Sequence, residues 1–162
     1  MKSLILLFIP VIAIGSCLIW AWYQPIFSWL HHPSQYPWEF WLAIVAAGIA
    51  LTGGIADWRY HRQGKRKITP LERRYEAMAL AGGVPLFLIM SGATLSPKPN
   101  QFIIPAIVTV LYMTVLICYD EFIFHRGCKP IETLMHRMLV FGNGLAWLAW
   151  AHWCFVRGGA YV

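Results

Sequence analysis

The chain has 162 residues, of which 59% are hydrophobic and only 12% are charged, and it contains nine tryptophans. This composition is typical of an integral membrane protein and argues against a soluble domain with a large core. The formal net charge of +6 would also suit nucleic acid. The basic residues stand beside apolar stretches, however, where the bias of Lys and Arg toward cytoplasmic loops explains them. We therefore expect the lipid bilayer, and no nucleic acid, as a partner.

Five apolar stretches have the length of about 20 residues that a helix needs to cross a bilayer. They cover residues 4–23, 38–58, 72–95, 102–124 and 131–156. We expect an all-α integral membrane protein in which residues 1–162 form a single transmembrane domain, a five-span helical bundle. The first stretch continues to Tyr23, past a lipoprotein-like box that ends at Cys17. A full span is longer than the apolar part of a signal peptide, so we interpret this stretch as a retained helix.

Lys and Arg are concentrated in two of the loops that join these spans. Ten of the thirteen basic residues lie in or beside them: Arg59, Arg62, Lys65, Arg66, Lys67, Arg73, Arg74, Arg126, Lys129 and Arg137. The opposite loops hold only Lys98, and the C-terminal tail holds only Arg157. This asymmetry predicts a multi-pass protein, in a bacterial inner membrane, with its N-terminus in the cytoplasm and its C-terminus outside.

Residues 120–137, DEFIFHRGCKPIETLMHR, carry the clearest chemical pattern in the chain. Glu121 precedes His125 by four residues, and Glu132 precedes His136 by four. On a helix, residues four apart share one face, one turn from each other. Two carboxylate–imidazole pairs are therefore expected on either side of the turn that ends at Pro130, which would open the last span.

Six of the seven carboxylates and three of the six histidines fall at the cytoplasmic ends of spans two to five. The direction of each span and the rise of about 1.5 Å per residue sort the candidate ligands into two layers. The inner layer comprises Asp57, Glu76, Glu121 and His136, and the outer layer comprises His61, Glu72, His125 and Glu132.

Carboxylates and imidazoles that project inward from four helices are the means by which helical bundles hold di-iron and di-manganese centres. We therefore expect spans two to five to form a four-helix core that holds two metal ions through these eight residues. The oxygen and nitrogen donors favour iron, and manganese or zinc would fit the same set. The spacing D/E-x-x-x-H differs from the E-x-x-H of soluble di-iron bundles, which leaves the ligand geometry open.

Two further polar residues have supporting roles in this prediction. Asp120 competes with Glu121, but Glu121 shares a face with His125, so we expect Asp120 to orient a ligand or to pair with an arginine. Asn143 lies two turns beyond His136 on the same stripe, where it would orient a substrate or water, or else form a hydrogen bond between helices.

Each acid also has an explanation that needs no metal. Thr69-Pro70-Leu71-Glu72 matches a capping box, in which Glu72 closes the start of the third span. Glu132 suits the first turn of a helix. Salt bridges of Asp57 with Arg62, or of Glu76 with Arg73, would account for single acids.

Three functions follow from these alternatives. The first is a membrane metal-dependent oxidoreductase of di-iron oxygenase, oxidase or desaturase type. It would act on a lipid or other apolar substrate, with a redox partner at the cytoplasmic face. Hydrolysis of a lipid headgroup would use the same metal ligands. The second is an electron carrier in which His61, with His125 or His136, ligates haem b. The third is a non-enzymatic subunit or metal transporter whose acids are only salt-bridged.

Overall fold

The protein is described here by a computed structural model that covers residues 2–63 and 68–159, with the side chains of residues 2–7 and 10 excluded. Within these ranges all regular structure is helical. The elements are α1 (Lys2–Trp22), η1 (Pro25–His31), η2 (Pro33–Gln35), α2 (Trp38–Arg62), α3 (Pro70–Leu95), η3 (Pro99–Phe102), α4 (Ile103–Ile123), α5 (Pro130–Ala151) and the π-helical turn η4 (His152–Val156). Lys65, Arg66 and Lys67 of the predicted basic loop lie outside the described residues.

Four segments are long and apolar enough to cross a membrane: α2, α3, α4 with the preceding η3, and α5 with η4. The all-helical class and the capacity for several membrane passes are thus confirmed. A fifth span requires α1 and η1 to count as one, although the axis bends by 102° between residues 11–22 and 25–31. The five-span bundle remains a prediction at its first span.

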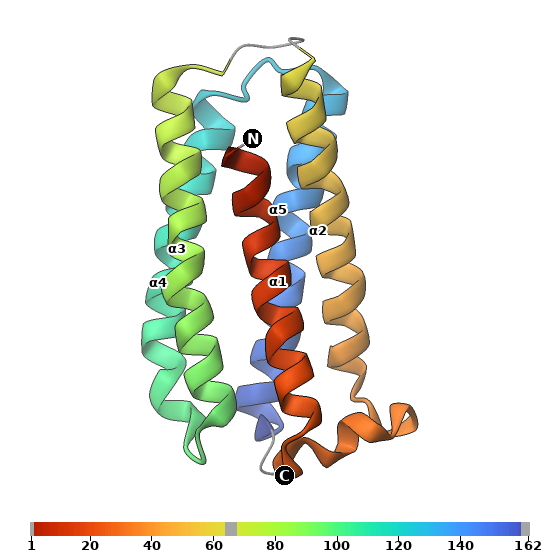
Figure 1. The fold of residues 1–162 in the computed structure, drawn as a ribbon. Helices are drawn as coiled ribbons and strands as arrows, with labels where there is room; N and C mark the ends of the chain where they lie inside the picture. Colours follow the sequence, from red (N-terminus) through yellow and green to blue (C-terminus); the bar gives the residue numbers. More distant parts are fainter. Residues whose placement is uncertain (1, 64–67, 160–162) are drawn as a thin grey trace.

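The bundle consists of two antiparallel helix pairs, α2 with α5 and α3 with α4 (Figure 1). Glycines bring α2 and α5 into backbone contact. A Cβ atom on Gly53 would lie 2.6 Å from the carbonyl oxygen of Met135, and one on Gly142 would lie 2.6 Å from that of Ala46. The helices can approach this closely only because glycine has no side chain, and these contacts fix the register of the two helices.

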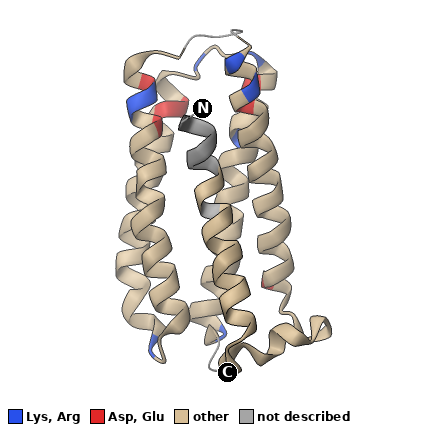
Figure 2. Ribbon diagram, viewed as in Figure 1, with Lys and Arg blue, Asp and Glu red and all other residues tan. Residues whose placement is uncertain are grey.

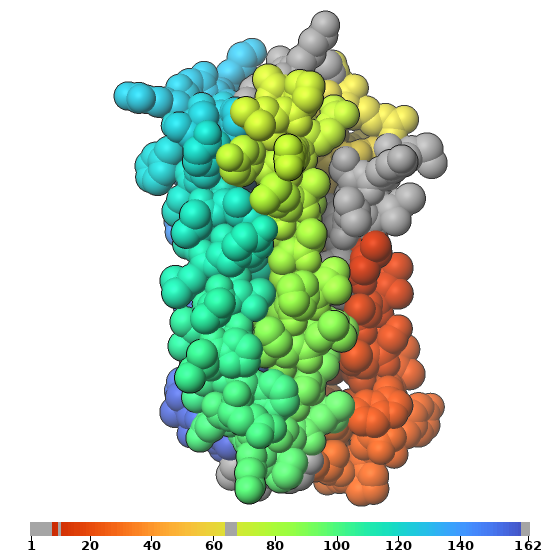
Figure 3. Space-filling model, turned by 90° about the vertical axis from the view of Figure 1, so that its left-hand side faces the viewer, coloured from red at the N-terminus to blue at the C-terminus, as the bar shows by residue number. Residues whose placement is uncertain are grey.

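Helices α3 and α4 lie against each other along their whole length (Figure 3). Gly82 leaves space for the side chain of Met113, and the rings of Tyr75 and Tyr119 stack with their centroids 4.4 Å apart. Helix α1 lies outside the four-helix bundle, beside α3 in this view and in front of the gap between the pairs in Figure 1.

Acidic and basic residues gather at the end of the bundle where α2 leads to α3 and α4 leads to α5 (Figure 2). The two kinds of charge are sorted by depth. Every basic residue described at this end is exposed: Arg59, Arg62, Arg73, Arg74, Arg126, Lys129 and Arg137. The six acids and three histidines are buried or half-buried. A polar interior with a basic rim therefore closes an otherwise apolar bundle.

Candidate metal centre

The turn between α4 and α5 carries His125 back over the end of α4. Helix α4 ends at Ile123, two residues before this histidine. The backbone NH of His125 donates to the carbonyl of Asp120 at 3.3 Å. Gly127 then reverses the chain with a φ of 149°, a conformation that favours glycine, and Lys129 is extended ahead of Pro130. As a result His125 faces Asp120 rather than continuing the face of Glu121.

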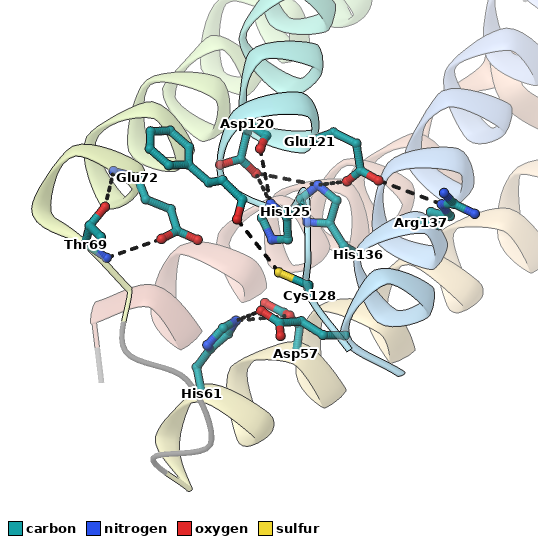
Figure 4. A network of polar contacts seen from close by, with 12 residues as sticks. Asp57, His61, Thr69, Glu72, Asp120, Glu121, His125, Cys128, His136 and Arg137 are labelled. Carbon is teal, nitrogen blue, oxygen red and sulfur yellow. Dashed lines mark hydrogen bonds and ion pairs between the residues drawn. The ribbon is translucent and has the colours of Figure 1, made fainter. Parts of the chain in front are cut away.

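Asp120, His125 and His136 form one group of potential ligands, whose ligand atoms all lie within 4.8 Å of one another (Figure 4). The carboxylate atom Oδ2 of Asp120 lies 3.3 Å from Nδ1 of His125 and 3.6 Å from Nε2 of His136. The two imidazole rings stack with centroids 4.3 Å apart. Only 6% of the Asp120 side chain and 3% of the His125 side chain are exposed. Two helices and the turn between them thus direct two nitrogens and one oxygen toward one point.

Glu121, on α4, extends this group toward α5. Its Oε2 lies 3.6 Å from Nε2 of His136, and its Oε1 lies 3.8 Å from Nε of Arg137. Arg137 is exposed over 62% of its side chain, so its charge is largely screened by solvent. One carboxylate oxygen of Glu121 therefore faces His136 in the interior, and the other faces Arg137 in the basic rim.

His61 connects α2 to α5 in a second group. Its Nε2 lies 3.4 Å from Oδ1 of Asp57, one turn earlier on α2, and 3.6 Å from Oε1 of Glu132 on α5. Asp57 and His61 thus form a D/E-x-x-x-H pair whose two members contact each other along one helix. Glu132 faces His61 across the α2–α5 interface.

Cys128 reaches the same interior from the turn. Ligand atoms of His125, Cys128 and Glu132 all lie within 4.8 Å of one another. The thiol also points toward the carbonyl of Phe124, with Sγ and O 3.8 Å apart (Figure 4). His125 thus belongs to two overlapping groups, one with Asp120 and His136 and one with Cys128 and Glu132.

The two acids of α3 complete the set. Glu72 is fully buried, and the predicted capping box is present: its Oε2 accepts from the backbone NH of Thr69, while the hydroxyl of Thr69 accepts from the NH of Glu72. Glu76 lies one turn deeper on the same helix and is half-buried. All four helices of the bundle therefore contribute to one polar interior.

The carboxylate–imidazole separations within this interior are within the range of an ion pair but longer than a charge-assisted hydrogen bond. The carboxylate–imidazole distances named above are 3.3 to 3.6 Å, whereas charge-assisted N–H···O hydrogen bonds measure about 2.7–2.9 Å. The pair of Glu39 and His152, at the opposite end of the bundle, closes to 2.7 Å. Oδ1 of Asp57, Oε2 of Glu121 and Nε2 of His136 are buried without forming a hydrogen bond.

Three predicted arrangements differ from those observed. Glu121 and His125 do not share a helix face, because α4 ends between them. Asp120, predicted to have a supporting role, is instead the carboxylate that contacts two histidines. Asn143 is exposed and donates to the carbonyl of Leu139 on its own helix at 2.9 Å, so it lies outside the group.

The predicted salt bridges with Asp57 and Glu76 are not among the described contacts. Instead, the guanidinium of Arg62 lies 5.2 Å from the ring centroid of Trp58.

One cluster was missed altogether. Glu39, which is 1% exposed, accepts from His152 at 2.7 Å and from Arg157 at 3.1 Å. Of the seven carboxylates in the sequence, it is the one that the sequence pattern does not assign to the cytoplasmic ends of the spans, and it lies at the start of an apolar span. That position was the available signal, because an acid there requires a partner.

Comparison of the chain with models of known families, with curated proteins and with solved structures gives no match. We therefore infer its function from the chemistry of the polar interior.

Proposed function

We propose that this chain is a membrane metalloprotein that oxidises a lipid or another apolar substrate, with iron as the favoured metal. Asp120, His125 and His136 would hold the first ion. A set of two histidines and one carboxylate with open positions suits non-haem Fe(II). A second ion would lie at His61, between Asp57 and Glu132.

The observation that carries this proposal is the spacing of the ligand atoms. Two ligand atoms that bind the same ion at about 2.1 Å lie on the order of 3.0–3.4 Å from each other, when the angle at the ion is between the octahedral and the tetrahedral value. The distances of 3.3 to 3.6 Å around Asp120 and His136 are close to this range. The 2.7 Å contact of Glu39 with His152 is what a carboxylate–imidazole pair in this chain adopts when the two bond to each other directly.

The charge of the interior supports the same conclusion. Six carboxylates converge there, while the described Lys and Arg side chains of that end are exposed. Buried charges need partners or metal ions, since an isolated carboxylate loses its hydration. Two divalent cations would neutralise four of the six acids without bringing a lysine or arginine inside.

A pocket of about 350 Å³ opens beside the centre and supports an amphiphilic substrate. It is lined by both apolar and basic side chains, among them Ile123, Phe124, Arg126 and Lys129, and it borders Glu132. The side chains of Arg126 and Lys129 would hold an acidic headgroup at the membrane surface, while Ile123 and Phe124 would contact the apolar part of the substrate. Oxidation of such a substrate with dioxygen takes two electrons from the substrate and two from a donor, which fits a redox partner at this face.

The haem alternative has less support. The two ligands of that haem would be His61 and either His125 or His136, but Nε2 of His61 faces Oδ1 of Asp57 at 3.4 Å and Oε1 of Glu132 at 3.6 Å. A haem would also leave the converging acids without a role. A preparation that shows a Soret band would nonetheless favour haem over the non-haem centre.

Metal analysis tests the proposal. The protein, purified in detergent without chelators, should contain iron and show no Soret band. Both His136→Ala and Asp120→Ala should lose the iron of the first position, which is about half of the total when both positions are filled. His32→Ala, an exposed histidine outside the cluster, is the matched control and should retain it. Reductant-dependent dioxygen consumption with membrane lipid should follow iron content across the variants. Wild-type protein that binds no transition metal would refute the proposal.

A further inference from the structure

We propose that His125, Cys128 and Glu132 form an alternative site, overlapping the iron positions, for a thiophilic ion such as Zn²⁺, and that its occupation excludes the catalytic metal. This site deepens the proposed function by adding its inhibition. Its existence as a zinc site depends only on the local geometry, so it can be tested even if the oxidoreductase proposal fails.

The geometry provides three different donors within one small volume. An imidazole nitrogen, a cysteine sulfur and a carboxylate oxygen lie within 4.8 Å of one another. His125 is 7% exposed and Glu132 is 1% exposed, while Cys128 is half-buried at the edge. Three protein ligands with a fourth position for water is the arrangement of zinc sites that exchange ligands.

Cys128 changes the metal preference of the interior. The other candidate ligands offer only oxygen and nitrogen, which suit iron and manganese. A thiolate selects softer ions, and zinc binds it at about 2.3 Å with release of the thiol proton. The group that contains Cys128 is thus expected to take zinc more readily than the group of Asp120, His125 and His136.

The two sites cannot be filled together, because they share a ligand. The neutral imidazole of His125 has one nitrogen lone pair, and one proton on the other nitrogen. If His125 turns this lone pair to the ion at Cys128, Asp120 and His136 lose their third ligand. Glu132 is shared as well, since its Oε1 lies 3.6 Å from Nε2 of His61. Zinc at Cys128 would therefore remove one donor from each proposed iron position.

An entry route leads to Cys128 from the basic rim. The pocket beside the centre is lined by Cys128 and Glu132, together with Tyr60 and Gly127 of the surrounding elements. A hydrated cation can thus reach the thiol from outside the bundle without crossing the apolar spans.

Cobalt substitution tests the site directly, because thiolate bound to Co²⁺ gives a near-ultraviolet charge-transfer band. Metal-free protein titrated with Co²⁺ should show this band, and Cys128→Ser should abolish it. Cys118→Ser, which alters an exposed thiol on α4, should leave it unchanged. His136→Ala should keep the band, because His136 belongs only to the other group. A band that survives in Cys128→Ser would overturn the assignment.

Zinc competition tests the exclusion. In iron-loaded wild-type protein, Zn²⁺ should displace iron. In Cys128→Ser, the Zn²⁺ concentration that halves iron occupancy, relative to the same variant without zinc, should rise at least tenfold. Equal sensitivity in both proteins would refute the exclusion even where the cobalt band is present. If the wild type binds no iron, the cobalt titration alone decides whether the zinc site exists.

Discussion

Asp120 contacts two histidines of the polar interior. One of its oxygens, Oδ2, is close to both His125 and His136, and the side chain is only 6% exposed. Glu121 contacts one histidine and an exposed arginine. The neighbouring acids therefore differ in what each can hold, although they are adjacent in sequence and identical in charge.

Asp120 and Glu121 allow a matched prediction of iron affinity. Asp120→Asn should lower iron affinity by about 10-fold or more, and should do so more strongly than Glu121→Gln, because it removes the charged donor nearest two ligands. Both variants retain side-chain volume, so competition against a chelator of known affinity measures the difference. A larger loss in Glu121→Gln would show that the sequence-based ranking of the two acids was the better one.

The gathering of acids and histidines at one end could be predicted from sequence, since helix direction and residue count give depth. The exchange of roles between Asp120 and Glu121 could not. It depends on where α4 stops, and the apolar run continues past that point through Phe124 without a sequence signal for the earlier end. Contacts across helices, such as His61 with Glu132, depend on a packing register that the spacing along one helix does not contain.

At the scale of elements, the start of α3 combines a helix cap with a buried acid. Thr69 and Glu72 exchange hydrogen bonds, as the sequence predicted, and Glu72 is also fully buried among the candidate ligands. Capping and metal binding make different demands on this residue, because glutamine also serves in a capping box.

Two substitutions separate these roles. Thr69→Ala should lower the free energy of unfolding by about 1 kcal/mol, because the helix loses its cap. Glu72→Gln should keep most of that stability and lower the metal content, because it removes a negative charge from the interior. Thermal unfolding and metal analysis of both proteins measure the two effects. Unchanged metal content in Glu72→Gln would assign the residue to capping alone.

The close approach of α2 and α5 gives a second prediction at this scale. A methyl group on Gly142 would meet backbone and side-chain atoms of Ala46 and Ala50 at 2.6 to 2.9 Å, whereas one on Gly144 would meet nothing within 4 Å. Gly142→Ala should therefore lower the unfolding temperature, with a cost of about 1–3 kcal/mol. Gly144→Ala is the matched control and should unfold at or above the wild-type temperature. Equal behaviour of the two variants would contradict the observed packing.

At the scale of the whole molecule, the two ends of the bundle use the same residue types differently. Glu39, His152 and Arg157 bond directly to one another and join the start of α2 to the end of the chain. The ligand cluster at the other end keeps its acids and histidines further apart. We call the bonded group of Glu39, His152 and Arg157 the polar clasp, in contrast to the more widely spaced candidate ligands at the other end.

Glu39→Gln tests this division. Loss of the charged contacts with His152 and Arg157 should lower the free energy of unfolding by about 1–2 kcal/mol, because both partners are partly exposed. Iron content of the folded protein should stay at the wild-type level, because the clasp is at the far end. Parallel loss of iron and stability would instead indicate that the two ends act as one unit.

X-ray absorption at the iron edge of the purified protein tests the central claim most directly. The account predicts a first coordination shell of nitrogen and oxygen at about 2.1 Å, with outer scattering from imidazole rings that falls in His125→Ala and His136→Ala. A shell of four porphyrin nitrogens, a shell dominated by sulfur, or an iron spectrum that neither substitution alters would contradict it.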